Sequence, residues 1–346
     1  MKTPRIAVTM GDPAGIGPEI VVKACRALRP RAEAGELKLL VVGTESCFRR
    51  AASALGVAWE LPRVEAATAG MPALALLESA VAEGPVVPGE VSAEAGRLAY
   101  AAIERSVGSA LDGSVEAIVT APISKEALNR AGYAYAGHTE LLAALTGSRD
   151  SVMMLAHGNM RVSHVSTHVA LAEVPKRLTP ERLDRVIELT RDTLADLGID
   201  RPRIAVAALN PHAGEGGMFG QEDSRVTVPA VARWRERGLE VEGPVPGDTV
   251  FVKLHAGQYD AVVAMYHDQG HIPVKLLGFS VDPETGAWDS LSGVNVTLGL
   301  PIIRSSVDHG TAFDIAGKGL ANEQSLIEAI DFAVRLGAAK AARAAA

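Results

Sequence analysis

The stretch that decides the fold class is residues 261–275, "AVVAMYHDQGHIPVK". The apolar run from Ala261 to Tyr266 predicts a buried strand, and the polar residues and glycine that follow predict a loop. The same order recurs along the chain: a short apolar run, a polar or glycine-rich loop, then a longer segment of helical period. This alternation predicts an α/β fold with a largely parallel sheet. The other expected strands are Ile6 to Met10, Lys38 to Val42, Ala117 to Thr120 and Ile204 to Leu209.

The clearest helix signals lie between residues 179 and 198. Thr179 is a suitable N-cap and Pro180 suits the first helical position. Apolar residues then recur on one face until Gly198 ends the helix, namely Leu183, Val186, Ile187, Leu194 and Leu197. Among the segments between elements, residues 83–96 predict a loop, residues 281–292 a polar surface insertion, and residues 337–346 a fraying helix or tail.

Composition narrows the class of protein. The chain has 346 residues, enough for about two domains, with 48% hydrophobic and 22% charged residues. No uncharged apolar run reaches the length of a transmembrane helix, which argues against a membrane span. The formal net charge of −7 and the lack of basic runs interleaved with aromatics argue against nucleic-acid binding. Two cysteines and no export signal lead us to expect a cytoplasmic protein, with Cys25 packed in a helix.

Three of the nine histidines follow predicted strands. They are His168, His212 and His267, and ligands of open α/β sheets bind beyond the carboxyl ends of the strands. Three neutral imidazoles with an open position are a common site for a catalytic divalent ion. Each could equally be a hydrogen-bonded loop residue, because sequence alone does not show that the three meet. Three other histidines, His157, His164 and His255, are expected to be structural.

Two glycine-rich segments could approach a ligand. The glycines of "LNPHAGEGGMFGQED" (209–223) would let backbone amides point at it, although a simple turn explains them as well. Neither a GxGxxG fingerprint nor a Walker A sequence follows a strand. In residues 294–323, Arg304 could anchor a phosphate or carboxylate, or pair with an acidic residue. Lys275 could add a second positive charge or be a solvated surface lysine.

Six ordered motifs carry a resemblance to a known family: "MGDPAGIGPEI", "VTAPISK", "GHTE", "LNPHAGEGG", "YHDQG" and "VNVTLGLPIIRSSVDHGTAFDIAGKG". Over nearly its whole length the chain resembles the 4-hydroxythreonine-4-phosphate dehydrogenase (PdxA) family. The loop "HGTAFDIAGKGLANE" also resembles the NAD-binding loop of the isocitrate and isopropylmalate dehydrogenases. The resemblance implies a two-domain, three-layer α/β fold with the active site in the interdomain cleft. The expected domains are residues 1–130 plus 301–346, which carry the NAD loop, and residues 131–300, which carry the metal ligands and the interface of a homodimer.

The resemblance also implies roles for individual residues. The metal ligands would be His168, His212 and His267, the last from the partner subunit. The metal would be zinc, or else cobalt, nickel, manganese or magnesium. The substrate would contact His138, Thr139, Lys275, Asn295 and Arg304. Lys275 and Asp248 would take part in catalysis, Asp248 across the dimer. NAD would lie against His309, Gly310, Thr311, Asp314 and Gly317.

The implied reaction is NAD-dependent oxidation of a CH–OH group in a 4-phosphorylated hydroxy acid, followed by decarboxylation of the β-keto acid. Two features differ from the members of vitamin B6 (pyridoxine) biosynthesis: His271 with Ile272 after "HDQG", and the insertion at 281–292. Both lie next to residues assigned to the substrate. The segments "YHDQGHIPVK" and "RVSHVSTHV" resemble a catabolic branch that oxidises 4-phospho-D-threonate or 4-phospho-D-erythronate. Two alternatives remain. The substrate could be 4-phosphohydroxy-L-threonine, or the protein could belong to a branch that oxidises a cis-dihydrodiol of terephthalate. From other classes, a metal-dependent hydrolase and a non-catalytic binder of phosphorylated metabolites remain open.

Overall fold

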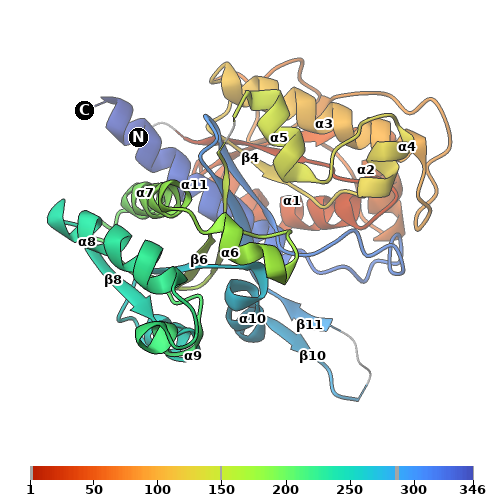
Figure 1. Ribbon diagram of the computed structural model, residues 1–346. Helices are drawn as coiled ribbons and strands as arrows, with labels where there is room; N and C mark the ends of the chain where they lie inside the picture. The colour runs from red at the N-terminus through yellow and green to blue at the C-terminus, as the bar shows by residue number, and fades with distance from the viewer. Residues whose placement is uncertain (1–2, 149, 285–287, 346) are drawn as a thin grey trace. The chain divides into compact units, whose positions relative to one another are not determined.

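The structure is a computed structural model that describes residues 3–148, 150–284 and 288–345. The chain divides into two compact units, shown in Figure 1. Unit 1 comprises Met1–Ser151 with Leu300–Ala346, and unit 2 comprises Val152–Gly299. The sequence border expected after residue 130 falls instead after Ser151, because α5 (His138–Thr146) packs against α3 (Ala93–Leu111) of unit 1.

Unit 1 is built on five parallel strands in the order β3-β2-β1-β4-β13. Their bounds are β1 Arg5–Thr9, β2 Lys38–Gly43, β3 Leu74–Glu78, β4 Ala117–Thr120 and β13 Ile303–Val307. The helices of this unit, besides α3 and α5, are α1 Gly17–Glu33, α2 Glu45–Ala54, α4 Lys125–Arg130 and α11 Gln324–Ala345. One core cluster joins the strands to α3 and α5 through residues such as Leu40, Ile103, Ile118 and Leu142.

Unit 2 has the strand order β12-β5-β6-β9-β7-β8. Strand β5 runs antiparallel to β12 and β6, whereas β6, β9, β7 and β8 are parallel. The strands are β5 Val152–His157, β6 Met160–His164, β7 Arg203–Ala207, β8 Glu240–Val245, β9 Ala261–Ala264 and β12 Val294–Leu298. The helices are α6 Val174–Arg177, α7 Pro180–Asp196, α8 Val228–Glu236, α9 Gly247–His255 and α10 His267–Gly278.

The local predictions agree with these elements. The α/β class with a large, mostly parallel sheet is confirmed, and each expected strand is present within three residues of its predicted bounds. Helix α7 begins after Thr179, whose hydroxyl accepts the Arg182 amide, and the chain leaves it at Gly198 with a positive φ. The apolar stripe of α7 is buried at Leu183, Val186, Ile187 and Leu194 because it covers the sheet.

Three segment predictions need adjustment. Residues 83–96 were expected to form a loop, but α3 begins at Ala93 because the Ser92 hydroxyl caps it by accepting the Ala95 amide. The insertion at 281–292 forms most of an antiparallel hairpin, β10 Phe279–Val281 with β11 Trp288–Leu291, and its residues 285–287 lie outside the described part. His164, expected in the middle of its strand, is the last residue of β6.

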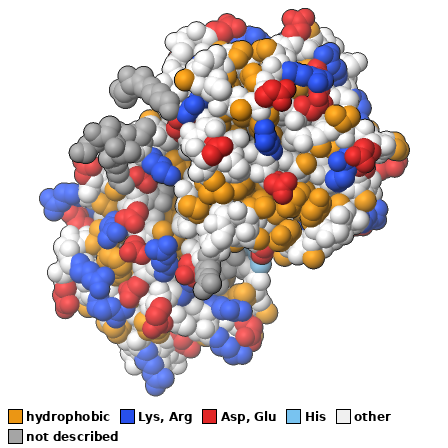
Figure 2. All heavy atoms as spheres, turned by 90° about the horizontal axis from the view of Figure 1, so that it is seen from above, with side chains coloured by type: hydrophobic (Ala, Val, Ile, Leu, Met, Phe, Trp, Pro, Cys, Tyr) orange, Lys and Arg blue, Asp and Glu red, His pale blue; other side chains and the backbone are white. Residues whose placement is uncertain are grey.

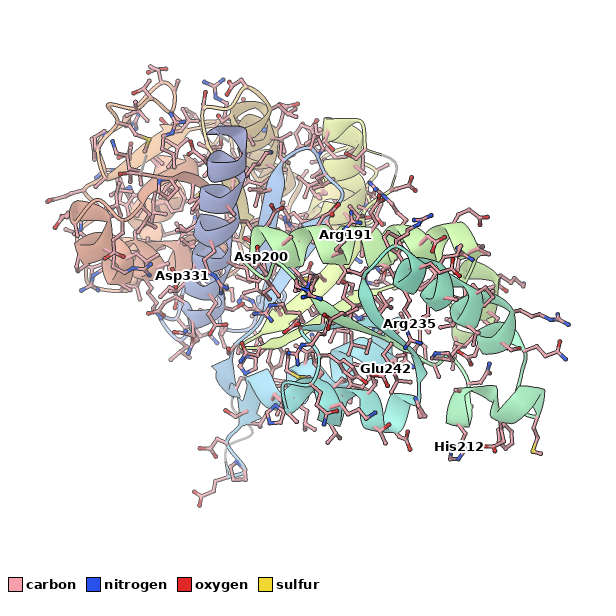
Figure 3. The ribbon with its side chains drawn as sticks, turned by 90° about the vertical axis from the view of Figure 1, so that its left-hand side faces the viewer. Arg191, Asp200, His212, Arg235, Glu242 and Asp331 are labelled. Carbon is pink, nitrogen blue, oxygen red and sulfur yellow. The ribbon has the colours of Figure 1, made fainter. Side chains whose placement is uncertain are left out.

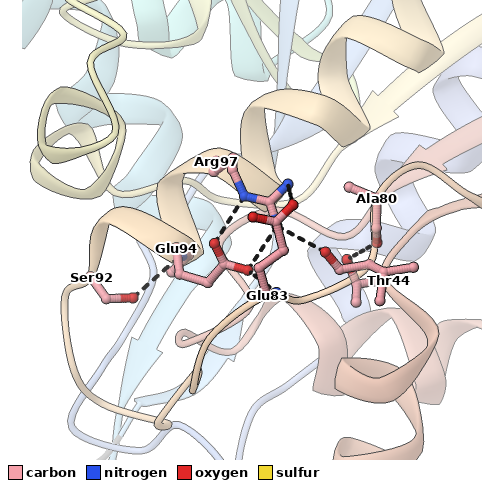
Figure 4. A network of polar contacts seen from close by, with 8 residues as sticks. Thr44, Ala80, Glu83, Ser92, Glu94 and Arg97 are labelled. Atoms are coloured by element: carbon pink, nitrogen blue, oxygen red, sulfur yellow. Dashed lines mark hydrogen bonds and ion pairs between the residues drawn. The ribbon is translucent and has the colours of Figure 1, made fainter.

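The start of α3 is reinforced by charged side chains (Figure 4). Arg97 donates two hydrogen bonds to the Glu94 carboxylate and also lies 3.7 Å from a Glu83 oxygen. The Glu94 carboxylate in turn accepts the Glu83 amide at 2.7 Å. A carboxylate in the first turn also interacts favourably with the helix dipole. These contacts tie the loop before α3 to its first turn.

On the face seen in Figure 2, Lys and Arg side chains are interspersed with Asp and Glu side chains. A search of the described helices for a long, apolar membrane-crossing segment finds none.

Candidate active site

The three strand-end histidines lie just beyond three adjacent parallel strands of unit 2. His168 follows β6, His267 follows β9 and His212 follows β7, and β9 lies between the other two. Because parallel strands present their carboxyl ends at one sheet edge, the three loops leave the sheet on the same side. The topology therefore places all three loops where the sequence analysis expects them.

His168 and His267 are close to each other. Their ring centroids are 5.8 Å apart, and two imidazoles on one tetrahedral zinc ion would have centroids roughly 5 Å apart. The Nδ1 atom of His267 lies 2.6 Å from the Asp268 carboxylate. A carboxylate on one ring nitrogen orients a metal-binding imidazole and leaves Nε2 for the ion. These two histidines fit a divalent metal ion.

His212 lies apart from that pair. It begins a left-handed turn in which residues 212–216 all have positive φ, three of them not glycine, and Figure 3 shows it at the outer edge of unit 2. Its ring contacts Phe219, with centroids 6.4 Å apart. Among the described residues of this chain, no three His, Cys, Asp or Glu side chains are grouped closely enough to hold an ion. The ligand role of His212 thus remains a prediction.

The His212 loop is anchored by a residue that the sequence analysis did not single out. Asp223 is fully buried, and its carboxylate accepts the backbone amides of Leu209 and Asn210 at 2.9 and 3.0 Å. The same carboxylate accepts the Asn210 side-chain amide at 3.1 Å, and Glu222 accepts it at 2.9 Å. Asp223 thereby secures the chain just before His212. Its position fourteen residues beyond Leu209 gives no local sequence signal.

A cavity of about 670 Å³ opens next to His212 within unit 2. His212, Asp248, Tyr266, Asp268 and Gln269 supply its polar lining, and the exposed apolar face of α10 supplies another wall through Ile272, Pro273 and Leu276. Asp248, expected to act across a dimer, is thus on the same cavity as His212.

Two further residues of unit 2, Lys275 and Asn295, are expected to contact the substrate, and they lie on different elements. The Lys275 ammonium lies 5.0 Å from the centre of the Phe279 ring, a cation–π contact at the end of α10. Asn295 is a half-buried residue of β12, paired in register with Leu155 of β5.

In unit 1, Arg304 is a buried cation. It lies on β13, 3% exposed, and donates from Nε and a terminal nitrogen to the Thr120 hydroxyl at 3.2 and 2.7 Å. Burial lowers the pKa of the guanidinium to about 9, so the side chain is still charged at neutral pH. Thr120 belongs to the "VTAPISK" motif. A buried guanidinium at a strand end suits a phosphate or carboxylate ligand.

His138 starts α5, followed by the half-buried Thr139. Desolvation, with a smaller contribution from the Arg304 charge, lowers the pKa of His138 well below its ordinary value. The imidazole is therefore neutral at pH 7. Its Nε2 atom is buried without a hydrogen-bond partner in the structure. A buried polar atom in this state is a candidate contact for a ligand.

The predicted NAD loop, residues 309–317, follows β13 and packs against the first loop of the chain. The Thr311 carbonyl accepts the Ile16 amide at 3.0 Å. A Cβ atom at Gly15 would lie 2.8 Å from that carbonyl oxygen, so the close approach requires glycine. Asp314 and Gly310 are exposed, His309 is half-buried, and Gly317 has a φ of +74° that favours glycine. The exposed residues of this loop could contact a ligand.

A charged pair on α1 holds the next part of this loop and was also missed from sequence. The buried Glu19 carboxylate accepts the amides of Gly319 and Ala321 at 3.2 and 2.8 Å. Lys23 donates to Glu19 and to the carbonyls of Gly319 and Ala321. Both charges therefore bind the same two residues, some 300 positions away in the chain.

Comparison with known proteins identifies relatives along the whole chain. A sequence model described as "Pyridoxal phosphate biosynthetic protein PdxA" matches residues 36–333. A protein of Bradyrhizobium diazoefficiens, provisionally named D-threonate 4-phosphate dehydrogenase, is 64% identical over 99% of both chains. The D-threonate 4-phosphate dehydrogenase of Salmonella typhimurium is 46% identical over 97% of this chain and 100% of that one. The 4-hydroxythreonine-4-phosphate dehydrogenase of Beijerinckia indica is 46% identical over 96% and 94%.

A solved structure agrees. The 4-hydroxythreonine-4-phosphate dehydrogenase of Klebsiella pneumoniae is 46% identical, covers 97% of this chain and 98% of its own, and superposes with a TM-score of 0.79. The relatives are named dehydrogenases, which confirms the prediction of an oxidoreductase acting on a CH–OH group and not a hydrolase or a binding protein. By the match of the family model and of relatives over nearly all of its length, the chain belongs to the PdxA family.

Proposed function

We propose that this protein uses NAD and a divalent metal ion to oxidise the secondary hydroxyl of a four-carbon hydroxy acid phosphorylated at carbon 4, and that the product then loses carbon dioxide. D-Threonate 4-phosphate is the preferred candidate, because the relative at 64% identity carries that name while relatives at 46% carry either name. D-Erythronate 4-phosphate and 4-phosphohydroxy-L-threonine are the alternatives within the same chemistry.

The observation that carries the proposal is the buried Arg304. A guanidinium with this little exposure, hydrogen-bonded to the neutral Thr120 hydroxyl, retains its charge at neutral pH and can bind an anionic group. The neutral His138, influenced by the same charge, offers an unpartnered Nε2 for a substrate oxygen. A phosphorylated acid has the anionic groups that such a site recognises. A cis-dihydrodiol of terephthalate, the remaining alternative, lacks the phosphate.

The metal ion is proposed for unit 2. His168 and His267 of the same chain, and not His267 of a partner as the resemblance implies, would hold it, with Nε2 of His267 on the ion and Nδ1 against Asp268. His212 would be the third ligand. When bound, the ion would lower the pKa of the substrate hydroxyl and NAD would accept the hydride. Lys275, Asp248 and Asn295 are proposed to contact the substrate. Zinc suits a set of nitrogen ligands, and cobalt, nickel, manganese or magnesium are the alternatives.

A homodimer is part of the proposal. The wall of the His212 cavity formed by α10 is apolar and exposed at Ile272 and Leu276, and Val252 of α9 is exposed as well. Exposed apolar surface of this kind marks interaction sites. A second copy of the chain covering this face would bring its own groups next to His212 and Asp248. These would complement a ligand set that the described residues of one chain do not group together.

The test is a substrate panel with NAD and added zinc, followed by NADH absorbance. The panel contains D-threonate 4-phosphate, D-erythronate 4-phosphate, 4-phosphohydroxy-L-threonine and the terephthalate dihydrodiol. We expect NADH with D-threonate 4-phosphate and none when a chelator is added. Turnover of the dihydrodiol alone would refute the role of a phosphate, and turnover in the presence of chelator would refute the role of the metal.

A further inference from the structure

His271 lies one helical turn after His267. It is one of the residues at which this chain differs from the pattern expected of the vitamin B6 members. Residues four apart on a helix share a face, and here the two imidazoles stack with centroids 3.6 Å apart and an angle of 12° between planes. One ring face of His267 is therefore covered by His271, while its edge contacts the Asp268 carboxylate.

A hydrogen bond fixes His271 itself. Its Nδ1 atom lies 2.9 Å from the backbone carbonyl of His267. A carbonyl only accepts, so Nδ1 of His271 carries the hydrogen and donates it. The bond joins the ring of His271 to the backbone of the residue on which it stacks.

The other side of His271 is held by the sheet. His271 is only 7% exposed, and the ring of the fully buried His164, at the end of β6, lies 4.8 Å from it. Gly270 makes this possible, because a Cβ atom there would lie 2.3 Å from Nε2 of His164. The first turn of α10 consequently rests on β6 through a ladder of rings in the order His164, His271, His267.

We infer that His271 is a positioning residue: its buried ring sets the orientation of the His267 imidazole before any ion binds. The Asp268 contact restrains one edge of the His267 ring, and the stack restrains the plane of that ring. Rotation about the two side-chain bonds of His267, Cα–Cβ and Cβ–Cγ, is therefore limited. The consequence of this inference, a change in metal affinity, rests on the proposed role of His267 as a metal ligand. Residues that orient a ligand in this way change metal affinity about 10- to 100-fold when they are replaced.

The experiment compares His271→Leu, which removes the aromatic ring, with His271→Phe, which keeps a stacking ring and loses the Nδ1 donor. Val274→Ala is the matched control, since Val274 is a buried residue of the same helix and, having no ring, is not part of the stack. The first readout is the side-chain rotamer of His267 in metal-free protein, measured from three-bond NMR couplings, because a ring-current shift would vanish with the His271 ring whatever the orientation of His267. The second is zinc affinity, measured by competition with a chromogenic chelator.

We expect a single His267 rotamer in the wild type and in His271→Phe, and averaging over rotamers in His271→Leu. Zinc affinity should fall about 10- to 100-fold in His271→Leu, and less in His271→Phe, and be unchanged in Val274→Ala. A single His267 rotamer, as in the wild type, in His271→Leu would overturn the inference. Failure of the wild type to bind zinc would refute the proposed metal role, while the His267 rotamer would still decide whether His271 positions His267.

Discussion

Glu94 shows how strongly neighbours control a single charge in this protein (Figure 4). The Arg97 guanidinium, and secondarily the Glu83 amide, lower the pKa of the Glu94 carboxyl from 4.5 to about 2, against the opposing effect of burial. A group with a lowered folded pKa adds stability above its unfolded pKa. That contribution is lost as the pH falls from 4.5 through about 2.

Glu94→Gln should therefore lower the free energy of unfolding at pH 7 by on the order of 1 kcal/mol, because two charge-assisted hydrogen bonds to Arg97 are weakened. The difference from wild type should shrink below pH 4.5. Urea unfolding at several pH values measures both. Glu126→Gln, which breaks an exposed pair with Arg130, should cost less than about 0.5 kcal/mol. Equal costs for the two variants, or a difference from wild type that does not change with pH, would contradict the assignment.

Single site residues were predictable from sequence to different degrees. His168, His212 and His267 each stand within five residues of the end of a strand, so their places beyond strand ends could be read locally. The roles of His271 and Asp223 could not, because each depends on a ring or an amide brought near it by folding.

At the scale of elements, helix α1 holds the segment after the proposed NAD loop. Lys23 binds the Gly319 and Ala321 carbonyls and pairs with the buried Glu19. Lys23→Met should reduce stability by about 2 kcal/mol, since it leaves Glu19 buried without its cation. It should also raise the KM for NAD several-fold with little change in kcat, because the loop loses its support.

A matched control is Lys38→Met. Lys38 also bridges two carbonyls of unit 1, those of Ala69 and Met71, away from the NAD loop. This variant should lose stability and keep the KM for NAD. Thermal unfolding and initial rates at varied NAD separate the two effects. An unchanged KM for NAD in Lys23→Met would show that α1 does not support the binding loop.

The second prediction at this scale concerns the loop after β7. Asp223→Asn should loosen the turn that carries His212, because an amide cannot accept all three hydrogen bonds now made by the carboxylate. We expect zinc affinity to fall about 10-fold or more. Asp260→Asn is the control, since Asp260 accepts the Arg203 amide where β7 begins, at the opposite end of that strand. Chelator competition on both variants is the measurement, and an equal loss of affinity in the two would point to general destabilisation.

For the whole molecule, the exposed apolar face of α10 decides the oligomeric state that we propose. Leu276 is 78% exposed, and Leu276→Glu would place a charge within an interface that a second copy covers. We expect the mass measured by light scattering to fall from that of a dimer to that of a monomer, with loss of turnover. Leu111→Glu, at an exposed leucine of unit 1, should leave the mass unchanged. A monomeric wild type, or a dimeric Leu276→Glu, would contradict the placement of the interface.

The sequence by itself determined the α/β class, five of the strands, the helix between residues 179 and 198, the strand-end histidines and the family, because hydrophobic period, turn residues and motifs are local. Only the tertiary structure decided which residues meet. The order β6-β9-β7 departs from chain order, and contacts such as Glu19 with Ala321 or His164 with His271 join distant positions. Burial also lowers the pKa of Arg304 and of His138, since desolvation depends on all surrounding atoms and not on neighbours in sequence.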